Sequence, residues 1–228
     1  MILHNFAVIE GCDGSGTTTA LGEVKKRFAA RRPGGGAPLL AGSEPTGGPV
    51  GLLIRRILRK EISMEKETLA RLFAADRGEH LYAPGGVAEH CRRGGLAVSD
   101  RYTPSSLVYQ GLECGRALPE ELNRSFPQPE LLVYLDVDPG TAMDRVGGRG
   151  DRELYETLEF QARVRDAYLE LLPRLEKEGV RVLFLDGTRP REEVAEAVWE
   201  ALIKMPALAE ETRGSWENAD TVGDEPKE

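Results

Sequence analysis

One stretch near the start of the chain constrains the fold most. An apolar run ends at Ile9, residues 10–16 are rich in glycine, and three threonines follow. A strand, a glycine turn and a helix in this order are typical of a P-loop, whose backbone N–H groups and helix N-terminus bind phosphate. We therefore predict a phosphate site formed by Gly11, Gly14, Ser15, Gly16, Thr17, Thr18 and Thr19.

This motif departs from its usual pattern at one residue. The pattern places a lysine directly after the second of two bracketing glycines, whereas Thr17 follows Gly16 in this chain. Thr18 still supplies the hydroxyl that a P-loop directs at Mg²⁺. On the motif alone, an ordinary glycine-rich turn between a strand and a helix is the alternative interpretation.

Apolar runs and amphipathic segments alternate along the rest of the chain. Strands are expected at 6–9, 38–41, 96–99, 131–137 and 180–185, and helices at 17–30, 49–60, 67–82, 87–93, 104–109, 138–146, 155–178 and 191–204. This alternation predicts a three-layer α/β fold, in which helices flank a five-stranded parallel sheet.

Composition and charge limit the domain organisation and the function classes. The formal net charge is −8, and residues 210–228 carry 7 acidic and 2 basic residues. We expect one domain over residues 1–206 and an acidic, disordered tail over 207–228. The chain has no block of basic residues of the kind that indicates nucleic-acid binding. It also has no apolar run that approaches the ~20 residues needed to span a membrane.

The cysteines and the first residues bear on where the protein works. The three cysteines are odd in number and lack metal-ligand spacing, which favours free thiols in a reducing compartment. The chain does not start with the cationic and apolar segments of a signal peptide. We therefore expect a cytoplasmic protein that binds neither membranes nor nucleic acid.

Several separated stretches carry a family resemblance. They are 9–18, Glu44-Pro45 with Gly47, 72–80, 100–102, 105–106, 109–111, 134–137, and 158–160 with Arg163. Together, in this order and at these distances, they resemble the thymidylate kinases from Phe6 to about Pro190. The resemblance implies a P-loop nucleoside monophosphate kinase with a small lid at about 147–153, and a homodimer.

The same resemblance implies a reaction, in which ATP and dTMP, with Mg²⁺, give ADP and dTDP. A nucleotide-binding degenerate homologue with little or no kinase activity is the alternative that Thr17 supports. Another nucleoside monophosphate kinase is a further alternative, which Asp13 and the pair Phe73 and Arg77 oppose.

The resemblance also implies which residues bind dTMP. These residues are Asp13, Arg55, Phe73, Arg77, Arg101, Ser105, Ser106, Tyr109 and Gln110. Arg101 would grip the phosphate with its planar fork, Phe73 would stack on thymine, and Arg77 would hydrogen-bond an exocyclic oxygen of the base. From residue types alone, an ordinary core residue is the better interpretation of Phe73, and Arg56 is the alternative to Arg55.

Catalytic roles fall, by resemblance, on Asp100, Arg101, Arg149 and Arg152. Asp100 would share Mg²⁺ with Thr18. Gly14 occupies the position where some family members have a catalytic arginine, so the lid arginines Arg149 and Arg152 would carry that role. Arg189 would lie on the adenine side.

The missing lysine leaves three accounts open. Another cation, such as Lys25, Lys26 or a lid arginine, replaces it; the enzyme is slow but sufficient; or the protein binds nucleotide without useful turnover. Lys25 and Lys26 lie about two helical turns, roughly 10 Å or more, beyond Thr17. We therefore expect neither lysine to reach the phosphates.

Overall fold

Five parallel strands form one sheet, as the sequence predicts. The computed structural model describes residues 1–31, 38–147 and 153–208. The strands are β1 (Ile2–Gly11), β2 (Leu39–Ser43), β3 (Leu96–Asp100), β4 (Gln128–Asp136) and β5 (Arg181–Asp186), in the order β2-β3-β1-β4-β5. Register pairs Ile9 with Asp100. The carboxyl ends of β1 and β3 therefore lie side by side, where ligands bind in sheets of this kind.

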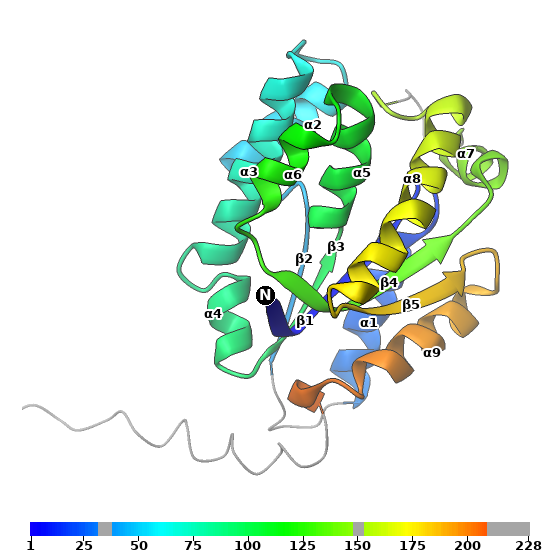
Figure 1. The fold of residues 1–228 in the computed structure, drawn as a ribbon. Helices are drawn as coiled ribbons and strands as arrows, with labels where there is room; N and C mark the ends of the chain where they lie inside the picture. Colours follow the sequence, from blue (N-terminus) through cyan, green and yellow to red (C-terminus); the bar gives the residue numbers. More distant parts are fainter. Residues whose placement is uncertain (32–37, 148–152, 209–228) are drawn as a thin grey trace, which may run out of the picture.

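Helices cover both faces of the sheet (Figure 1). One face carries α1 (Thr17–Arg31), α9 (Arg191–Leu202) and the 3₁₀ helix η1 (Pro206–Leu208). The other face carries α2 (Pro49–Leu58), α3 (Lys66–Tyr82), α4 (Val87–Arg92), α5 (Thr103–Cys114) and α8 (Leu158–Lys177). Two shorter helices, α6 (Ala117–Asn123) and α7 (Pro139–Gly147), complete the described chain.

The side-chain alternation of β1 explains the two layers. Phe6 and Val8 belong to the core under α3, α5 and α8, whereas Ala7 and Ile9 belong to the core under α1 and α9. Successive side chains of a strand point to opposite faces, so a strand that is apolar throughout must be covered on both sides. The apolar run at the start of the P-loop thus requires the three-layer arrangement.

The structure differs from the sequence prediction at several element bounds: β1 already starts at Ile2, β4 at Gln128, and α8 only at Leu158. Helix α5 continues to Cys114 instead of stopping at residue 109, because Tyr109 and Gln110 are buried and their packing outweighs the cost of Gly111, about 1 kcal/mol. Helix α6 was not predicted; it is short and carries Pro119 in its first turn. At the other end of the domain, the packed chain continues to Leu208, past the boundary expected at residue 206.

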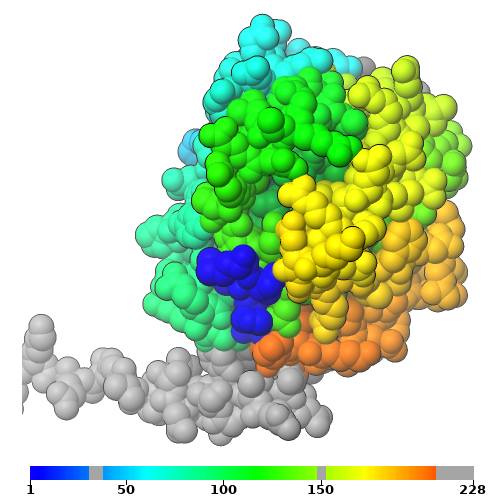
Figure 2. Space-filling view, in the orientation of Figure 1, coloured from blue at the N-terminus to red at the C-terminus, as the bar shows by residue number. Residues whose placement is uncertain are grey.

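The two ends of the described chain meet at the amino ends of the strands. The backbone N–H of Ala207 donates to Asn5 Oδ1 at 2.8 Å. Met1 is exposed, and in Figure 2 the N-terminal residues (blue) reach the surface beside α8 (yellow). Within the described ranges, no helix is long and apolar enough to cross a membrane.

Candidate active site

A cavity of about 790 Å³ opens at the carboxyl ends of β1, β2 and β3. Helices α1, α2, α3 and α5 contribute to its walls. All nine residues predicted to bind dTMP line it, together with Thr18 and Asp100: Asp13, Arg55, Phe73, Arg77, Arg101, Ser105, Ser106, Tyr109 and Gln110. The glycines of the P-loop, Thr17 and Arg189 do not line this cavity.

Arg101 occupies the centre of the site, directly after β3. Its Nη2 donates to Asp13 Oδ1 at 2.6 Å, and its Nη1 donates to Gly11 O and Ser105 Oγ, each at 3.2 Å. The guanidinium carbon lies 5.1 Å from the centre of the Tyr109 ring. The residue has a φ of 72°, a left-handed conformation that turns the chain sharply from β3 toward α5. The P-loop and the start of α5 thus hold one guanidinium between them.

Asp13 is fixed on its other side by a residue that sequence analysis missed. Gln161 Nε2 donates to Asp13 Oδ2 at 2.8 Å, and the backbone N–H of Asp13 donates to Gln161 Oε1 at 3.0 Å. The hydroxyl of Tyr109 also donates to Asp13 Oδ1, at 3.1 Å. Gln161 is fully buried in the first turn of α8. Gln161 directly follows the 158–160 stretch of the family resemblance, and this position could have identified it as a site residue from the sequence.

Glu10 lies under this assembly and is fully buried. Its Oε1 accepts from the backbone N–H of Tyr102 at 2.9 Å, and its Oε2 accepts from Ser105 Oγ at 2.6 Å and Tyr168 Oη at 2.8 Å. Burial raises the pKa of Glu10 to about 7, although Arg101 and the three donors act in the opposite direction. Ser105 connects Glu10 to Arg101, so a buried carboxyl group supports the position of Arg101.

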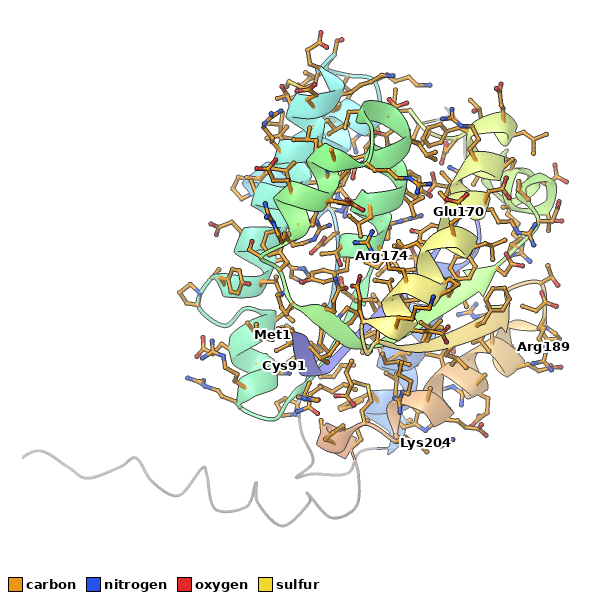
Figure 3. All side chains as sticks on the ribbon, in the orientation of Figure 1. Met1, Cys91, Glu170, Arg174, Arg189 and Lys204 are labelled. Atoms are coloured by element: carbon orange, nitrogen blue, oxygen red, sulfur yellow. The ribbon has the colours of Figure 1, made fainter. Side chains whose placement is uncertain are left out.

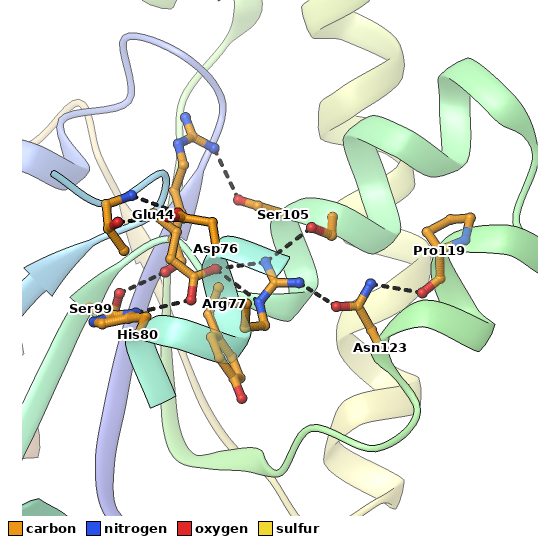
Figure 4. Close-up of polar contacts among 12 residues, drawn as sticks. Glu44, Asp76, Arg77, His80, Ser99, Ser105, Pro119 and Asn123 are labelled. Atoms are coloured by element: carbon orange, nitrogen blue, oxygen red, sulfur yellow. Dashed lines mark hydrogen bonds and ion pairs between the residues drawn. The ribbon is translucent and has the colours of Figure 1, made fainter. Parts of the chain in front are cut away.

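Arg77 forms the floor of the cavity through contacts within the protein (Figure 4). Its Nε donates to Glu44 Oε2 at 2.9 Å and its Nη2 to Ser106 Oγ at 3.0 Å, while its Nη1 donates to Asn123 Oδ1. The side chain is 1% exposed and Glu44 is 3% exposed. Most of its N–H groups therefore already have partners within the protein.

The two candidate arginines of α2 have different surroundings. Arg55 lines the cavity and donates to Pro45 O and, at 3.4 Å, to Ser43 Oγ. Arg56 lies outside the cavity, where its Nε donates to Glu61 Oε2 at 3.2 Å. Among these two residues, only Arg55 offers a positive charge to a ligand in the cavity.

The P-loop has the backbone conformation that its glycines allow. Gly14 and Gly16 have φ values of 85° and 101°, and a Cβ on Gly14 would collide with the carbonyl of Ala142 in α7. Thr18 Oγ1 donates to Asp100 Oδ2 at 2.6 Å. Thr17 is only 6% exposed.

Two further arginines, Arg145 and Arg189, lie outside the cavity near the carboxyl end of β5. Arg189 lies at the end of β5 (Figure 3) and pairs with Glu193 at 3.1 Å. Arg145 of α7, which sequence analysis missed, donates to Gly187 O at 3.2 Å and Gly14 O at 3.5 Å. The lid residues Arg149 and Arg152 lie outside the described residues.

A comparison of the sequence with models of known protein families agrees with this fold and site. The family model for thymidylate kinase matches residues 9–198. The chain belongs to the thymidylate kinase family. This finding confirms the predicted family, the P-loop kinase fold and the class of nucleoside monophosphate kinases.

Individual relatives extend the similarity over most of the chain. A protein of Treponema pallidum, provisionally named as a thymidylate kinase, is 43% identical over 73% of this chain and 78% of its own length. One of Aeropyrum pernix, with the same provisional name, is 40% identical over 85% of this chain and 95% of its own length. The thymidylate kinase of Leptospira borgpetersenii is 32% identical over 87% of this chain and 93% of its own length.

Proposed function

We propose that the protein transfers the terminal phosphoryl group of ATP to dTMP, giving ADP and dTDP. The observation that carries this proposal is the cavity beside the P-loop, which is lined by arginines, a carboxylate, an aromatic ring and polar side chains. Family membership supports the same reaction. Nothing in the described geometry favours the degenerate, inactive alternative.

The acceptor would lie across the cavity from the arginines toward α3. Arg101 and Arg55 offer the planar forks that bind a phosphate dianion. Asp13 and Tyr109 together would face the sugar. The Tyr109 ring would lie where the 2′-hydroxyl of a ribose would clash with it, which favours a deoxyribose. Phosphoryl transfer depends mainly on such positioning and on charge stabilisation.

The base would lie near Phe73, Ser106 and Gln110. Phe73 is partly buried and lines the cavity, where its ring would stack on the base. Gln110 is 3% exposed, and its Oε1 is buried without a hydrogen-bond partner in the described structure. An unpaired buried acceptor is costly, and an N–H of a pyrimidine base would satisfy it.

The donor phosphates would lie on the P-loop. Its glycines turn the backbone N–H groups inward, and the first turn of α1 adds the positive end of a helix dipole. Ser15 Oγ is buried and has no hydrogen-bond partner in the described structure, which leaves it free for a phosphate oxygen. These groups would hold ATP without the usual lysine.

The donor set fits Mg²⁺ as a companion of the nucleotide. Thr18 and Asp100 would hold it, because their oxygens are hard ligands and Asp100 Oδ1 is buried without a partner in the described structure. The described residues include no cluster of three or more metal-ligating side chains, so phosphate oxygens and water would complete the coordination. Bound there, the ion would neutralise the charge of the phosphates.

Two further predictions about this function stay predictions. The resemblance assigns charge stabilisation to Arg149 or Arg152, in addition to Arg101, and it implies a homodimer. Arg149 and Arg152 are each substituted by alanine to identify the catalytic lid arginine. Alanine at that position should lower kcat by roughly 10³-fold or more. Light scattering of the purified chain measures its oligomeric state.

The test of the proposed function is an acceptor panel. Purified protein, ATP and Mg²⁺ are incubated with dTMP, the ribonucleotide analogue of dTMP, dCMP and AMP, and the diphosphate products are quantified. We expect the highest kcat/KM for dTMP and a lower value for the ribonucleotide. A clear preference for dCMP or AMP, or no product with any acceptor, contradicts the proposal.

A further inference from the structure

The cavity extends along α1 as far as Lys25, which lines it together with Thr18 and Asp100. Thr18, Leu21, Gly22 and Lys25 all line the cavity, and their spacing of three and four residues places them on one face of the helix. The lysine two turns away therefore shares a space with the hydroxyl that follows Thr17.

The surface of α1 between Lys25 and Thr18 is uncrowded at Gly22. A Cβ added to Gly22 would meet nothing within 4 Å, and helical side chains lean toward the N-terminus of their helix. Seven residues of α-helix rise about 10 Å, and the four-carbon stem of a lysine spans roughly 6 Å of that distance. Oxygens of a phosphate bound beside Thr18 would cover the remaining few ångströms.

Two of the basic side chains that line the cavity, Lys25 and Arg55, form no ion pair with a described carboxylate. Arg77 is paired with Glu44 and Arg101 with Asp13. Lys25 forms no ion pair with any carboxylate in the described part of the chain. Its neighbour Lys26 differs, because it pairs with Glu23 at 3.0 Å and lies outside the cavity.

We propose that Lys25 supplies the transferring phosphoryl group with part of the positive charge that Thr17 does not provide. An ammonium is a compact point charge on a flexible stem, so it can serve the same phosphate from another anchoring position. The inference rests on the proposed function and assigns Lys25 as an additional phosphate-binding residue of the same site. Because the charge acts on the group in transfer, its loss affects kcat more than KM for dTMP.

The test combines Lys25→Met with a matched control, Lys26→Met, in the wild type and in Thr17→Lys. In the wild type, we expect Lys25→Met to lower kcat at least tenfold and Lys26→Met to stay within twofold. Lys25→Arg, which keeps the charge, should retain most activity. In Thr17→Lys, where the usual charge is restored, the loss caused by Lys25→Met should shrink to threefold or less.

Two results overturn the inference: equal kcat for Lys25→Met and Lys26→Met, or the same loss from Lys25→Met in both backgrounds. Equal thermal unfolding midpoints for the two methionine variants confirm that folding is not the cause. If neither the wild type nor Thr17→Lys forms dTDP, the proposed function fails separately. Calorimetric binding of a non-hydrolysable ATP analogue then decides on Lys25, with affinity about fivefold weaker in Lys25→Met than in Lys26→Met as the supporting result and equal affinity as the contrary one.

Discussion

Asp13 Oδ1 lies 2.6 Å from Arg101 Nη2, so one ion pair joins the P-loop to the residue that follows β3. The pair is partly buried, with side-chain exposures of 24% and 19%. Asp13 also holds Gln161 and Tyr109. The donor and acceptor halves of the proposed site are therefore positioned by a common carboxylate.

Asp13→Asn is expected to weaken the acceptor side selectively. The amide keeps the size of the side chain but removes the charge that orients Arg101. We expect KM for dTMP to rise about tenfold, which corresponds to about 1.4 kcal/mol, with KM for ATP changed less than twofold. Steady-state kinetics with each substrate varied in turn measures both values, and an equal rise in both would show that Asp13 acts on the whole P-loop.

Phe73→Ala is expected to lower dTMP affinity without affecting ATP. Stacking of an aromatic side chain on a base contributes about 1–3 kcal/mol, so the dissociation constant for dTMP should rise roughly tenfold to a hundredfold. Leu72→Ala is the control, because Leu72 packs against the core from the same helix and does not line the cavity. Calorimetry that finds unchanged dTMP affinity in Phe73→Ala would assign Phe73 to the core alone.

Arg77→Met is expected to destabilise the fold, because the buried Glu44 carboxylate loses its arginine and keeps only His80, at 3.0 Å, as an ion-pair partner in the described structure. Removing one member of a buried pair costs about 3–5 kcal/mol, which denaturant unfolding can resolve. The double variant Glu44→Gln with Arg77→Met should recover part of that loss. If Arg77→Met lowers dTMP affinity while the free energy of unfolding stays unchanged, Arg77 serves the ligand and not the cavity floor.

Glu10→Gln is expected to gain stability relative to the wild type as the pH rises. The pKa of Glu10 is raised from 4.5 to about 7 in the fold. A raised carboxyl pKa contributes stability that is fully present below pH 4.5 and is lost as the pH rises through about 7. Glutamine does not titrate, so its free energy of unfolding relative to the wild type should increase by about 2 kcal/mol between pH 5.5 and pH 8.

Denaturant unfolding of both proteins at the two pH values tests the role of Glu10. Other titrating groups are common to the two proteins, so their difference isolates this carboxyl group. A stability difference that does not change with pH would mean that Glu10 titrates normally.

Three features could be predicted because short segments of the sequence determine them: the P-loop, the alternation of strands and helices, and the core on both faces of the sheet. Residues 6–9 are apolar without a break, and only a doubly covered strand buries such a run. Arg101, Asp13 and Tyr109 meet around one cavity because β1 and β3 are neighbours in the sheet, an order that the sequence did not predict. A family resemblance was still needed to assign them to a nucleotide.

The remaining features depend on contacts between distant segments. The partner of Arg77 is Glu44, 33 residues away, and the partner of Asp13 is Gln161, 148 residues away. A local sequence pattern does not predict whether an arginine on an amphipathic helix donates its hydrogen bonds to other residues of the protein or to a ligand. Likewise, the helical distance between Thr17 and Lys25 was estimated correctly, but the cavity that connects Thr18 with Lys25 depends on β2 and on the empty space at Gly22.

The hydrogen bond between Ala207 and Asn5 has a practical consequence. It anchors the last described helix, η1, to the amino-terminal half of β1, whereas the cavity opens at the carboxyl ends of the strands. The last described residues therefore lie at the end of the sheet opposite the opening of the cavity. An affinity handle, a surface tether or a fused reporter joined directly to Leu208 would start from that end of the domain.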